Sequence, residues 1–194
     1  MGAPTMQATN VPGHIIFLNG IPNAGKTTLA NAVQAALEEP YWHLSLDDFL
    51  RGYTTRHWLR ANPPSFTRVM HGYLRSLRGL ALCGNNIVAE AVITPERLAT
   101  YLDLFGDLPV LLVGLHVPLE EARRRERERT DRIQPYEVTA RDLERVHAHG
   151  IYDLELDTAH LTQEEAIQRV LALVASPPSP TAFQQMMTRQ EVRE

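Results

Sequence analysis

An uninterrupted phosphate-loop pattern, G-x-x-x-x-G-K-[ST], occupies residues 20–27 and most constrains what this chain can fold into. Glycines in such a loop let the backbone turn its N–H groups toward a phosphate, where a side chain would block the approach. A short apolar run, residues 14–20, precedes the loop, and a helical pattern, residues 26–37, follows it. The unpaired N–H groups at the start of that helix favour an anion. We expect a nucleoside triphosphate to contact Gly20, Ile21, Pro22, Asn23, Ala24, Gly25, Lys26, Thr27 and Thr28.

The lysine of this motif is the one lysine in a chain of 194 residues with 19 basic side chains. The prevalence of arginine elsewhere fits the codon bias of a GC-rich genome. A guanidinium is too broad to replace a compact ammonium inside the loop, which explains why Lys26 is retained. We expect Lys26 to reach the outer phosphates and assist catalysis, and the Thr27 hydroxyl to ligate Mg²⁺.

Strand and helix patterns alternate along the chain. Short apolar runs predict strands at residues 14–20, 42–47, 86–93, 110–117 and 153–157, with helical patterns between and after them. This alternation is typical of an α/β domain, a parallel sheet with helices on both faces, in which ligands bind beyond the carboxyl ends of the strands. We expect one domain over residues 13–176. A flexible lead-in, residues 1–12, would precede it, and a flexible tail, residues 177–194, would follow, because three prolines interrupt the pattern there.

Acidic side chains accompany the second and third predicted strands, near the expected phosphates. The second strand leads to Asp47 and Asp48, and the third carries Glu90 inside an apolar run. Asp47 is a candidate catalytic base that accepts or positions the proton of an attacking hydroxyl. Asp48 is a candidate substrate contact, and its simpler interpretation is a cap for the next helical turn. Glu90 is a candidate contact to substrate or to metal-bound water, with a buried pair to an arginine as the alternative.

Arginines at helical spacing follow the fourth predicted strand. Arg125, Arg129 and Arg132 fall at i, i+4 and i+7, before the helix break expected at residues 134–135. On a hinged lid, such arginines would neutralise the charge of a transferring phosphoryl group. We expect Arg125 to bind the nucleotide, and Arg129 and Arg132 to assist catalysis. The alternative is a solvated helix face, since Glu121 precedes Arg125 by four residues.

The amino-acid composition bears on the cellular compartment of the protein and on the kinds of partner that we expect for it. Cys83 is the one cysteine, which excludes an intramolecular disulfide and suits a reducing cytosol. His147 and His149 stand two residues apart and do not share a helix face, so we expect local contacts near Gly150 instead of a metal site. No apolar run is long enough to span a bilayer, residues 1–10 do not resemble a signal peptide, and the net charge is −4. We expect a cytoplasmic protein without a membrane partner, for which nucleic acid is disfavoured and the oligomeric state stays open.

The chain resembles the chloramphenicol phosphotransferase family of P-loop kinases over about residues 14–175. The resemblance rests on IIFLNGIPNAGKT, on LDD after the second strand, on RERERTDR after the fourth, and on HAHGIYDLELDT before the last helix. It implies a single P-loop kinase-like domain with an arginine-bearing lid, and it implies ATP as the phosphoryl donor. It further implies that Asp47 is the base and that Arg125, Arg129 and Arg132 are the lid arginines.

The acceptor stays open, because residues 49–73 match this family poorly. Tyr53, Trp58 and Phe66 are candidates for stacking on a flat acceptor. The leading hypothesis is an ATP-dependent O-phosphotransferase that acts on a small-molecule alcohol, with an antibiotic as one candidate. The alternatives are a polynucleotide 5′-kinase or nucleotide-sugar kinase, with a groove lined by arginines of residues 51–68, and a non-catalytic nucleotide-binding switch. ATP is preferred to GTP because the guanine-selecting N-K-x-D motif is absent.

Overall fold

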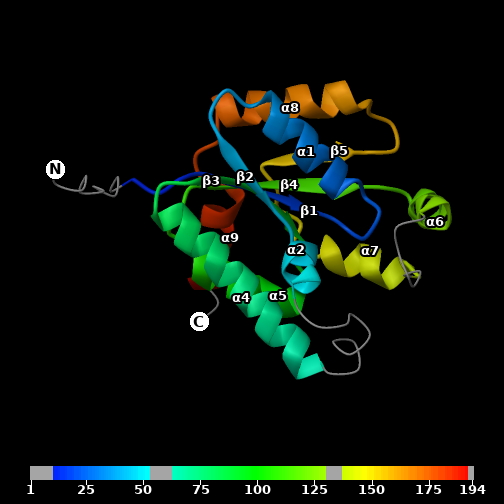
Figure 1. The fold of residues 1–194 in the computed structure, drawn as a ribbon, viewed down its shortest axis with the longest axis horizontal. Helices are drawn as coiled ribbons and strands as arrows, with labels where there is room; N and C mark the ends of the chain where they lie inside the picture. Colours follow the sequence, from blue (N-terminus) through cyan, green and yellow to red (C-terminus); the bar gives the residue numbers. More distant parts are fainter. Residues whose placement is uncertain (1–10, 53–62, 130–136, 192–194) are drawn as a thin grey trace.

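The fold is built on five parallel strands, seen in a computed structural model that describes residues 11–52, 63–129 and 137–191. Their order across the sheet is β2-β3-β1-β4-β5, and every pair of neighbours is parallel (Figure 1). This arrangement confirms the predicted α/β class and the five-stranded parallel sheet. The strands are β1 (Ile15–Asn19), β2 (Tyr41–Leu44), β3 (Asn86–Ala91), β4 (Val110–His116) and β5 (Leu154–Asp157).

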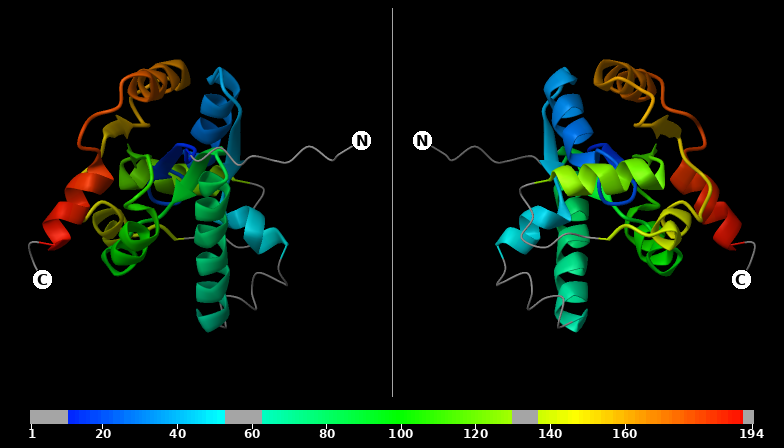
Figure 2. Two further views of the ribbon diagram at one scale, coloured as in Figure 1. Left: turned by 90° about the vertical axis from the view of Figure 1, so that its left-hand side faces the viewer. Right: turned by 90° about the vertical axis from the view of Figure 1, so that its right-hand side faces the viewer.

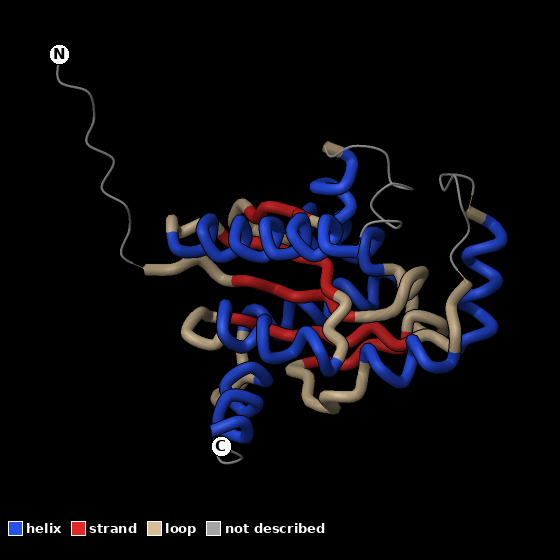
Figure 3. Tube along the Cα trace, turned by 90° about the horizontal axis from the view of Figure 1, so that it is seen from below, coloured by secondary structure: helices blue, strands red, loops and turns tan. Residues whose placement is uncertain are grey.

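Helices cover both faces of this sheet (Figures 1 and 3). Helices α1 and α8 lie on one face, and α4, α5 and α9 lie beside one another on the other face (Figure 2). Within the described ranges, no helix is both long and apolar enough to cross a membrane. The helices are α1 (Lys26–Ala36), α2 (Leu46–Arg51), α4 (Pro63–Leu82), α5 (Pro95–Phe105), α6 (Leu119–Glu128), α7 (Ala140–Val146), α8 (Gln163–Ala175) and α9 (Ala182–Glu191).

The central strand β1 is buried along its whole length. Successive side chains of a strand point to opposite faces of the sheet, so β1 contributes to both hydrophobic clusters. Ile15 and Phe17 pack into the cluster beneath α4, α5 and α9, and Ile16 and Leu18 pack into the one beneath α1 and α8. Burial on both faces explains why this strand is a continuous apolar run and not an alternating pattern.

The phosphate loop, residues 20–27, leaves the carboxyl end of β1 and enters α1. The chain then forms β2 and β3 on one side of β1, and β4 and β5 on the other side. The direction in which the sheet grows therefore reverses next to β1, which creates the crevice where open α/β sheets bind their ligands. The strand–loop–helix context predicted for the motif is confirmed.

Strand β2 is shorter than predicted. It ends at Leu44, whereas the sequence suggested a strand over residues 42–47. Ser45 begins α2 through a reciprocal capping box, in which Ser45 Oγ accepts a hydrogen bond from Asp48 N (3.3 Å) and Asp48 Oδ2 accepts one from Ser45 N (2.9 Å). Asp47 therefore lies in the first turn of α2 and not at the end of a strand.

The expectation of a flexible tail over residues 177–194 is wrong for most of its length. Residues Ala182–Glu191 form helix α9, which packs on the sheet beside α5. Phe183 is fully buried, and its ring is stacked on Phe17 with 6.0 Å between the ring centroids. The carboxylate of Asp153 accepts a hydrogen bond from the first backbone N–H of α9 at 2.7 Å. The prolines thus separate two helices, and the packed unit extends beyond residue 176.

Truncation of the buried ring in α9 tests this correction. We expect Phe183→Ala to lower the free energy of unfolding by about 3–5 kcal/mol, because it leaves a cavity against the sheet. Urea denaturation followed by circular dichroism measures the change. The control is Gln190→Ala on the exposed side of the same helix, with an expected change within about 0.5 kcal/mol. Equal stabilities of the two variants would show that α9 does not cover the core.

Candidate functional site

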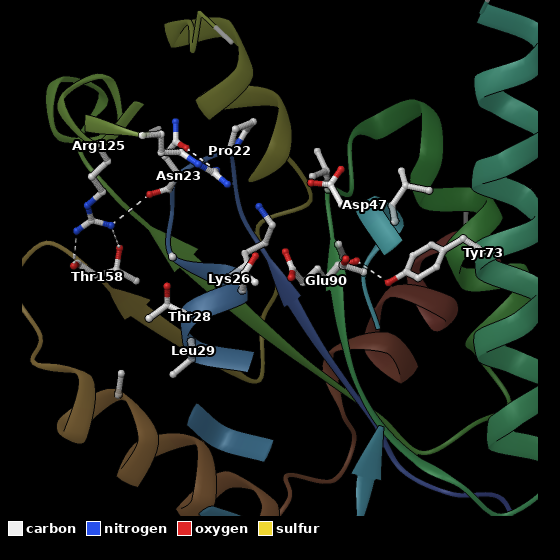
Figure 4. Close-up of a pocket in the computed structure, with 18 of the residues that line it drawn as sticks. Pro22, Asn23, Lys26, Thr28, Leu29, Asp47, Tyr73, Glu90, Arg125 and Thr158 are labelled. Atoms are coloured by element: carbon white, nitrogen blue, oxygen red, sulfur yellow. Dashed lines mark hydrogen bonds between the residues drawn. The ribbon is translucent and has the colours of Figure 1, made fainter. Parts of the chain in front are cut away.

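A cavity of about 770 Å³ lies at the carboxyl edge of the sheet, beside the phosphate loop. The loop and the start of α1 form its middle, α2, α4, β3 and α5 form one end, and the segment from β5 into α8 forms the other end together with α6. Figure 4 shows Lys26 between two groups of side chains, with Asp47, Glu90 and Tyr73 on one side and Asn23, Arg125 and Thr158 on the other.

The phosphate loop has the conformation that its glycines predict. Gly25 has φ +90°, a left-handed conformation that glycine adopts without strain. A Cβ atom on Gly20 would lie 2.8 Å from the carbonyl oxygen of Leu115, so a side chain there would collide with β4. Asn23 also has a positive φ, 66°, which asparagine tolerates better than most residues. The loop therefore depends on these residue types, and not on backbone flexibility alone.

Lys26 places its ammonium over the loop. Its Nζ donates hydrogen bonds to the carbonyl oxygens of Gly20 (2.8 Å) and Ile21 (2.9 Å). The side chain points into the cavity (Figure 4). The ammonium and the N–H groups at the start of α1 thus lie in one small region, which is the arrangement that binds phosphate.

Glu90 brings a largely buried carboxylate next to that ammonium. Its Oε1 lies 3.2 Å from His43 Nε2, and His43 Nδ1 lies 2.9 Å from Asn31 Oδ1. Burial alone would raise the pKa of Glu90. The hydrogen bond with His43, the charge of Lys26 and the Thr27 hydroxyl together outweigh burial, and the pKa lies below its ordinary value. An ionised carboxylate therefore faces the cavity, and among the described residues its side-chain partner is His43 and not the arginine of the alternative interpretation.

The two neighbouring aspartates have different surroundings. Asp47 lines the cavity, as the sequence predicted. Asp48 uses one carboxylate oxygen for Ser45, at the cap of α2, and pairs with Arg51 through the other. Asp48 does not belong to the lining of this cavity, so the structure supports its capping role and does not bring it to the site as a substrate contact.

The cavity end beyond Asp47 has an apolar surface. Phe66 and Met70 of α4 and Tyr101 of α5 line it. Burial raises the pKa of Tyr101 to about 12, against the opposing effect of the Arg97 charge, so its hydroxyl stays neutral. Of the aromatic side chains proposed to stack on an acceptor, Phe66 is at the site. Tyr53 and Trp58 lie outside the described residues.

Tyr73 joins the ends of two strands beneath this surface. Its hydroxyl lies 3.0 Å from the carbonyl oxygen of Leu44 and 3.0 Å from that of Glu90, and one of these carbonyls accepts its hydrogen. Burial raises the pKa of Tyr73 well above its ordinary value. The hydroxyl is thus a structural hydrogen-bond donor between β2 and β3, and not a candidate base.

The arginine-bearing segment contacts the phosphate loop at one side. Arg125 donates to the Asn23 carbonyl (3.2 Å) and to the Thr158 carbonyl (2.8 Å), and its Nε pairs with Glu121 at 2.8 Å. Arg129 donates to Asn23 Oδ1 at 3.2 Å. Both arginines line the cavity, whereas Arg132 lies outside the described residues. The structure therefore brings two of the three predicted arginines to the site.

Several lining residues were not predicted from the sequence, and among them are two polar groups that could contact a ligand. Arg97 projects from the first turn of α5, and Thr158 follows β5. Nothing in the local sequence distinguishes Arg97 from the other arginines of the chain. The available signal was its position, since residues that directly follow a parallel strand lie at the ligand-binding edge of the sheet.

A buried polar network supports the loop from below. Asn19, the last residue of β1, is fully buried. Its Oδ1 accepts from Ile93 N at 2.8 Å, and its Nδ2 donates to the Val146 carbonyl (3.0 Å) and to the Tyr152 hydroxyl (2.8 Å). These bonds fix the start of the phosphate loop relative to β3 and α7, and an unpaired amide at this depth would be costly.

Histidines surround Tyr152 in the same region. The rings of His116 and His147 are stacked with 4.1 Å between their centroids, and His147 Nδ1 lies 2.6 Å from the Tyr152 hydroxyl. Burial, together with the neighbouring His116 and His149, lowers the pKa of His147 to about 4. The prediction that His147 and His149 make local contacts near the turn at Gly150 is confirmed.

Comparison with known proteins places the chain among phosphotransferases. The family described as chloramphenicol phosphotransferase-like protein matches residues 13–175. Two curated relatives from Mycobacterium tuberculosis strains, which carry the provisional name O-phosphotransferase, are each 31% identical over 202 residues and cover 91% of this chain and 89% of their own.

Solved structures share the fold at low sequence identity. The Mycobacterium tuberculosis APS kinase, solved with AMPPNP and APS, has a TM-score of 0.58 at 20% identity, over 86% of this chain and 99% of its own. The shikimate kinase of Acinetobacter baumannii, solved with shikimate, has a TM-score of 0.62 at 17% identity, over 86% of this chain and 94% of its own. These likenesses confirm the P-loop kinase fold.

The half-buried ring of His147 predicts a specific dependence of stability on pH. Between about pH 6.5 and pH 4 the unfolded chain takes up a proton at this position and the native chain does not, so the stability falls as the pH decreases. We expect roughly 1–2 kcal/mol of loss, discounted from the full linkage value for partial exposure. His147→Gln should lose less stability than the parent between pH 7 and pH 4 in urea denaturation. If the free energies of unfolding of the two proteins fell equally between pH 7 and pH 4, His147 would not be the group responsible for the loss of stability.

Proposed function

The chain belongs to the chloramphenicol phosphotransferase-like family, and from that premise we propose that it transfers the γ-phosphoryl group of ATP to a hydroxyl of a small molecule. The observation that carries the proposal is a single cavity lined by both Lys26 of the phosphate loop and Asp47 of α2. A phosphate-binding loop and a candidate base thus face the same space (Figure 4). Placing the two reactants in one cavity supplies much of the rate enhancement expected of such an enzyme.

ATP would lie with its phosphates on the loop and its base toward α8. The N–H groups at the start of α1 and the ammonium of Lys26 favour the triphosphate there. The cavity end toward α8 combines an apolar surface, from Leu161 and Ala166, with the hydroxyl groups of Thr158 and Thr162. This mixture suits a purine and its ribose. The absence of the N-K-x-D motif supports adenine over guanine.

In the proposed step, the acceptor oxygen attacks the γ-phosphorus while the bond from that phosphorus to the β–γ bridging oxygen breaks. The products are ADP and a phosphate monoester of the acceptor. The hydroxyl proton passes to the Asp47 carboxylate and then to water. Lys26, Arg125 and Arg129 line the same cavity and would neutralise the charge that spreads over the phosphoryl oxygens. Arg132 stays a further candidate for that role.

The residues beside Lys26 fit a magnesium ion. The Thr27 hydroxyl and the Glu90 carboxylate are hydrogen-bonded to each other, and both offer the oxygen ligands that Mg²⁺ prefers. Thr27 would contact the ion directly, and Glu90 would hold one of its waters. When bound with ATP, the ion neutralises charge on the β- and γ-phosphates.

Removal of the loop ammonium tests nucleotide binding. We expect Lys26→Ala to weaken binding of AMPPNP with Mg²⁺ by about 10- to 100-fold, because it removes charge-assisted hydrogen bonds to phosphate. Lys26→Arg should not restore binding, since its fork does not fit the loop. Isothermal titration calorimetry measures the affinities, and Arg127→Ala on the exposed face of α6 is the control. Unchanged affinity in a folded Lys26→Ala variant would remove the basis of the proposal.

Substitution of the candidate base tests phosphoryl transfer. Incubation with ATP, Mg²⁺ and a panel of hydroxylated antibiotics and metabolites, followed by mass spectrometry, should reveal an acceptor that gains one phosphate. Asp47→Asn should then lower kcat by roughly 100-fold or more with little change in AMPPNP affinity, because the carboxylate acts on the hydroxyl and not on the nucleotide. Asp48→Asn, which changes the cap of α2 and the pair with Arg51 outside the cavity, is the matched control for this change.

Other outcomes of this experiment separate the alternatives. Transfer to a 5′-hydroxyl oligonucleotide, and to no small molecule, would favour a polynucleotide kinase. Slow ATP hydrolysis without any acceptor, together with an Asp47→Asn variant that behaves like the parent, would favour a nucleotide-binding switch. Either result contradicts the proposed transfer to a small alcohol.

A further inference from the structure

Arg97 is a cation at the acceptor end of the cavity that the proposed transfer does not use. It is the third residue of α5, directly after the carboxyl end of β3. Its half-buried side chain lines the cavity together with Val92 and Tyr101, and its charge acts on the Tyr101 hydroxyl. The phosphate loop lies at the middle of the cavity, so Arg97 is on the side where the acceptor would bind and not on the nucleotide side.

Within the part of the chain that the structure describes, most of the hydrogen-bonding capacity of Arg97 is unused. Its Nη1 donates to the Val92 carbonyl at 3.2 Å, and no carboxylate of the described residues forms an ion pair with it. The adjacent acid, Glu96, turns away and pairs with Arg145 and with the Thr94 hydroxyl. A guanidinium has five N–H donors in a planar fork that matches an oxyanion.

Two arginines of α2 and α4 have acidic partners, and a third, Arg68, donates to the Ser65 hydroxyl. Arg78 forms a two-bond pair with Asp107, at 2.6 and 2.8 Å, and Arg51 pairs with Asp48. Arg97 differs from them, because it faces a cavity and holds only a backbone carbonyl. Placing a charged group at a partly desolvated wall without a counter-charge is unfavourable, unless a ligand supplies that charge.

The charged side chains that line the cavity are mostly cationic. Four of them are basic, Lys26, Arg97, Arg125 and Arg129, and two are acidic, Asp47 and Glu90. The whole chain has a net charge of −4, so the cavity differs in sign from the chain as a whole. The field inside the cavity therefore favours anions.

We propose that Arg97 binds an oxyanion group of the acceptor, and that the acceptor is a small alcohol that carries a carboxylate, sulfate or phosphate. This inference rests on the proposed function and specifies its substrate class. The side chains of Phe66, Met70 and Tyr101, which line the same end of the cavity, would contact the body of such a molecule. Arg97 takes no part in the transfer of the phosphoryl group or of the proton, and fixes the acceptor so that its hydroxyl faces Asp47.

The test measures binding and needs no turnover. The protein is first saturated with AMPPNP and Mg²⁺, which occupies the phosphate loop. It is then titrated by calorimetry with hydroxy acids of increasing length, from glycerate to 4-(hydroxymethyl)benzoate, and each acid is compared with its neutral primary amide. Sulfate and phosphate esters of diols are titrated in the same way, and each ester is compared with its parent diol. We expect at least one charged member to bind roughly 10- to 100-fold more tightly than its neutral counterpart, as a charge-assisted hydrogen bond would give.

Variants assign that preference to Arg97. Arg97→Gln should reduce the charged-over-neutral preference to under about threefold while leaving AMPPNP affinity unchanged, and Arg97→Lys should retain part of it. Arg75→Gln removes an exposed arginine of α4 outside the cavity and should keep the full preference. Equal loss of charged and neutral binding in Arg97→Gln would show a structural role and overturn the proposal.

The remaining outcomes are also decisive. If no charged member binds more tightly than its neutral counterpart, the proposal is wrong although the proposed function stands. If a 5′-hydroxyl oligonucleotide binds more tightly than every small anion, the proposal is wrong and a polynucleotide kinase is favoured. If the parent protein does not bind AMPPNP at all, the proposed function itself fails, and this inference fails with it. The two failures are therefore distinguishable.

Discussion

Burial of β1 on both faces is the constraint on which the site depends. A strand that is covered on both sides has one position in the sheet, so the point at which the chain leaves it is fixed. Asn19 fixes that point further, because its side-chain amide bonds to backbone or hydroxyl groups from three other parts of the chain. Gly20 then passes so close to β4 that no side chain fits. The N–H groups of the loop are thus oriented by packing before any phosphate arrives, which is the preorganisation that electrostatic catalysis requires.

Much of this arrangement could be predicted from the sequence, because it follows from local patterns. The apolar run before Gly20, the loop motif and the helix after it are contiguous, and the alternation of strand and helix predicts the parallel sheet. The remainder depends on contacts between distant segments. Asp47 and Asp48 are adjacent in sequence, and only the capping box with Ser45 separates their roles. Glu90 is an isolated acid in the sequence, and its partner His43 comes from a neighbouring strand. Helix α9 was missed because the prolines before it suggested an end, whereas the burial of Phe183 against Phe17 stabilises a further element.

The charges of the cavity explain why a polyanion would bind it. Four cationic side chains line it, Lys26, Arg97, Arg125 and Arg129, against the two carboxylates of Asp47 and Glu90. The hydrogen bond with His43 and the charge of Lys26 lower the pKa of Glu90, so this carboxylate is ionised beside the cations that would hold phosphate. A triphosphate adds the negative charge that the lining lacks.

The two ends of the cavity are formed by different parts of the chain, and this difference bears on which residues determine the choice of acceptor. The nucleotide end is shaped largely by backbone, since glycines, the start of α1 and carbonyl groups define the phosphate loop. The acceptor end is made of side chains from α2, α4 and α5 that are free to vary while the sheet stays the same. Within that end, Tyr73 is fully buried and holds strand ends together, so it is constrained by the fold. Among the described residues, Arg97 makes one hydrogen bond, to a backbone carbonyl, so its presence is better explained by the molecule that binds there.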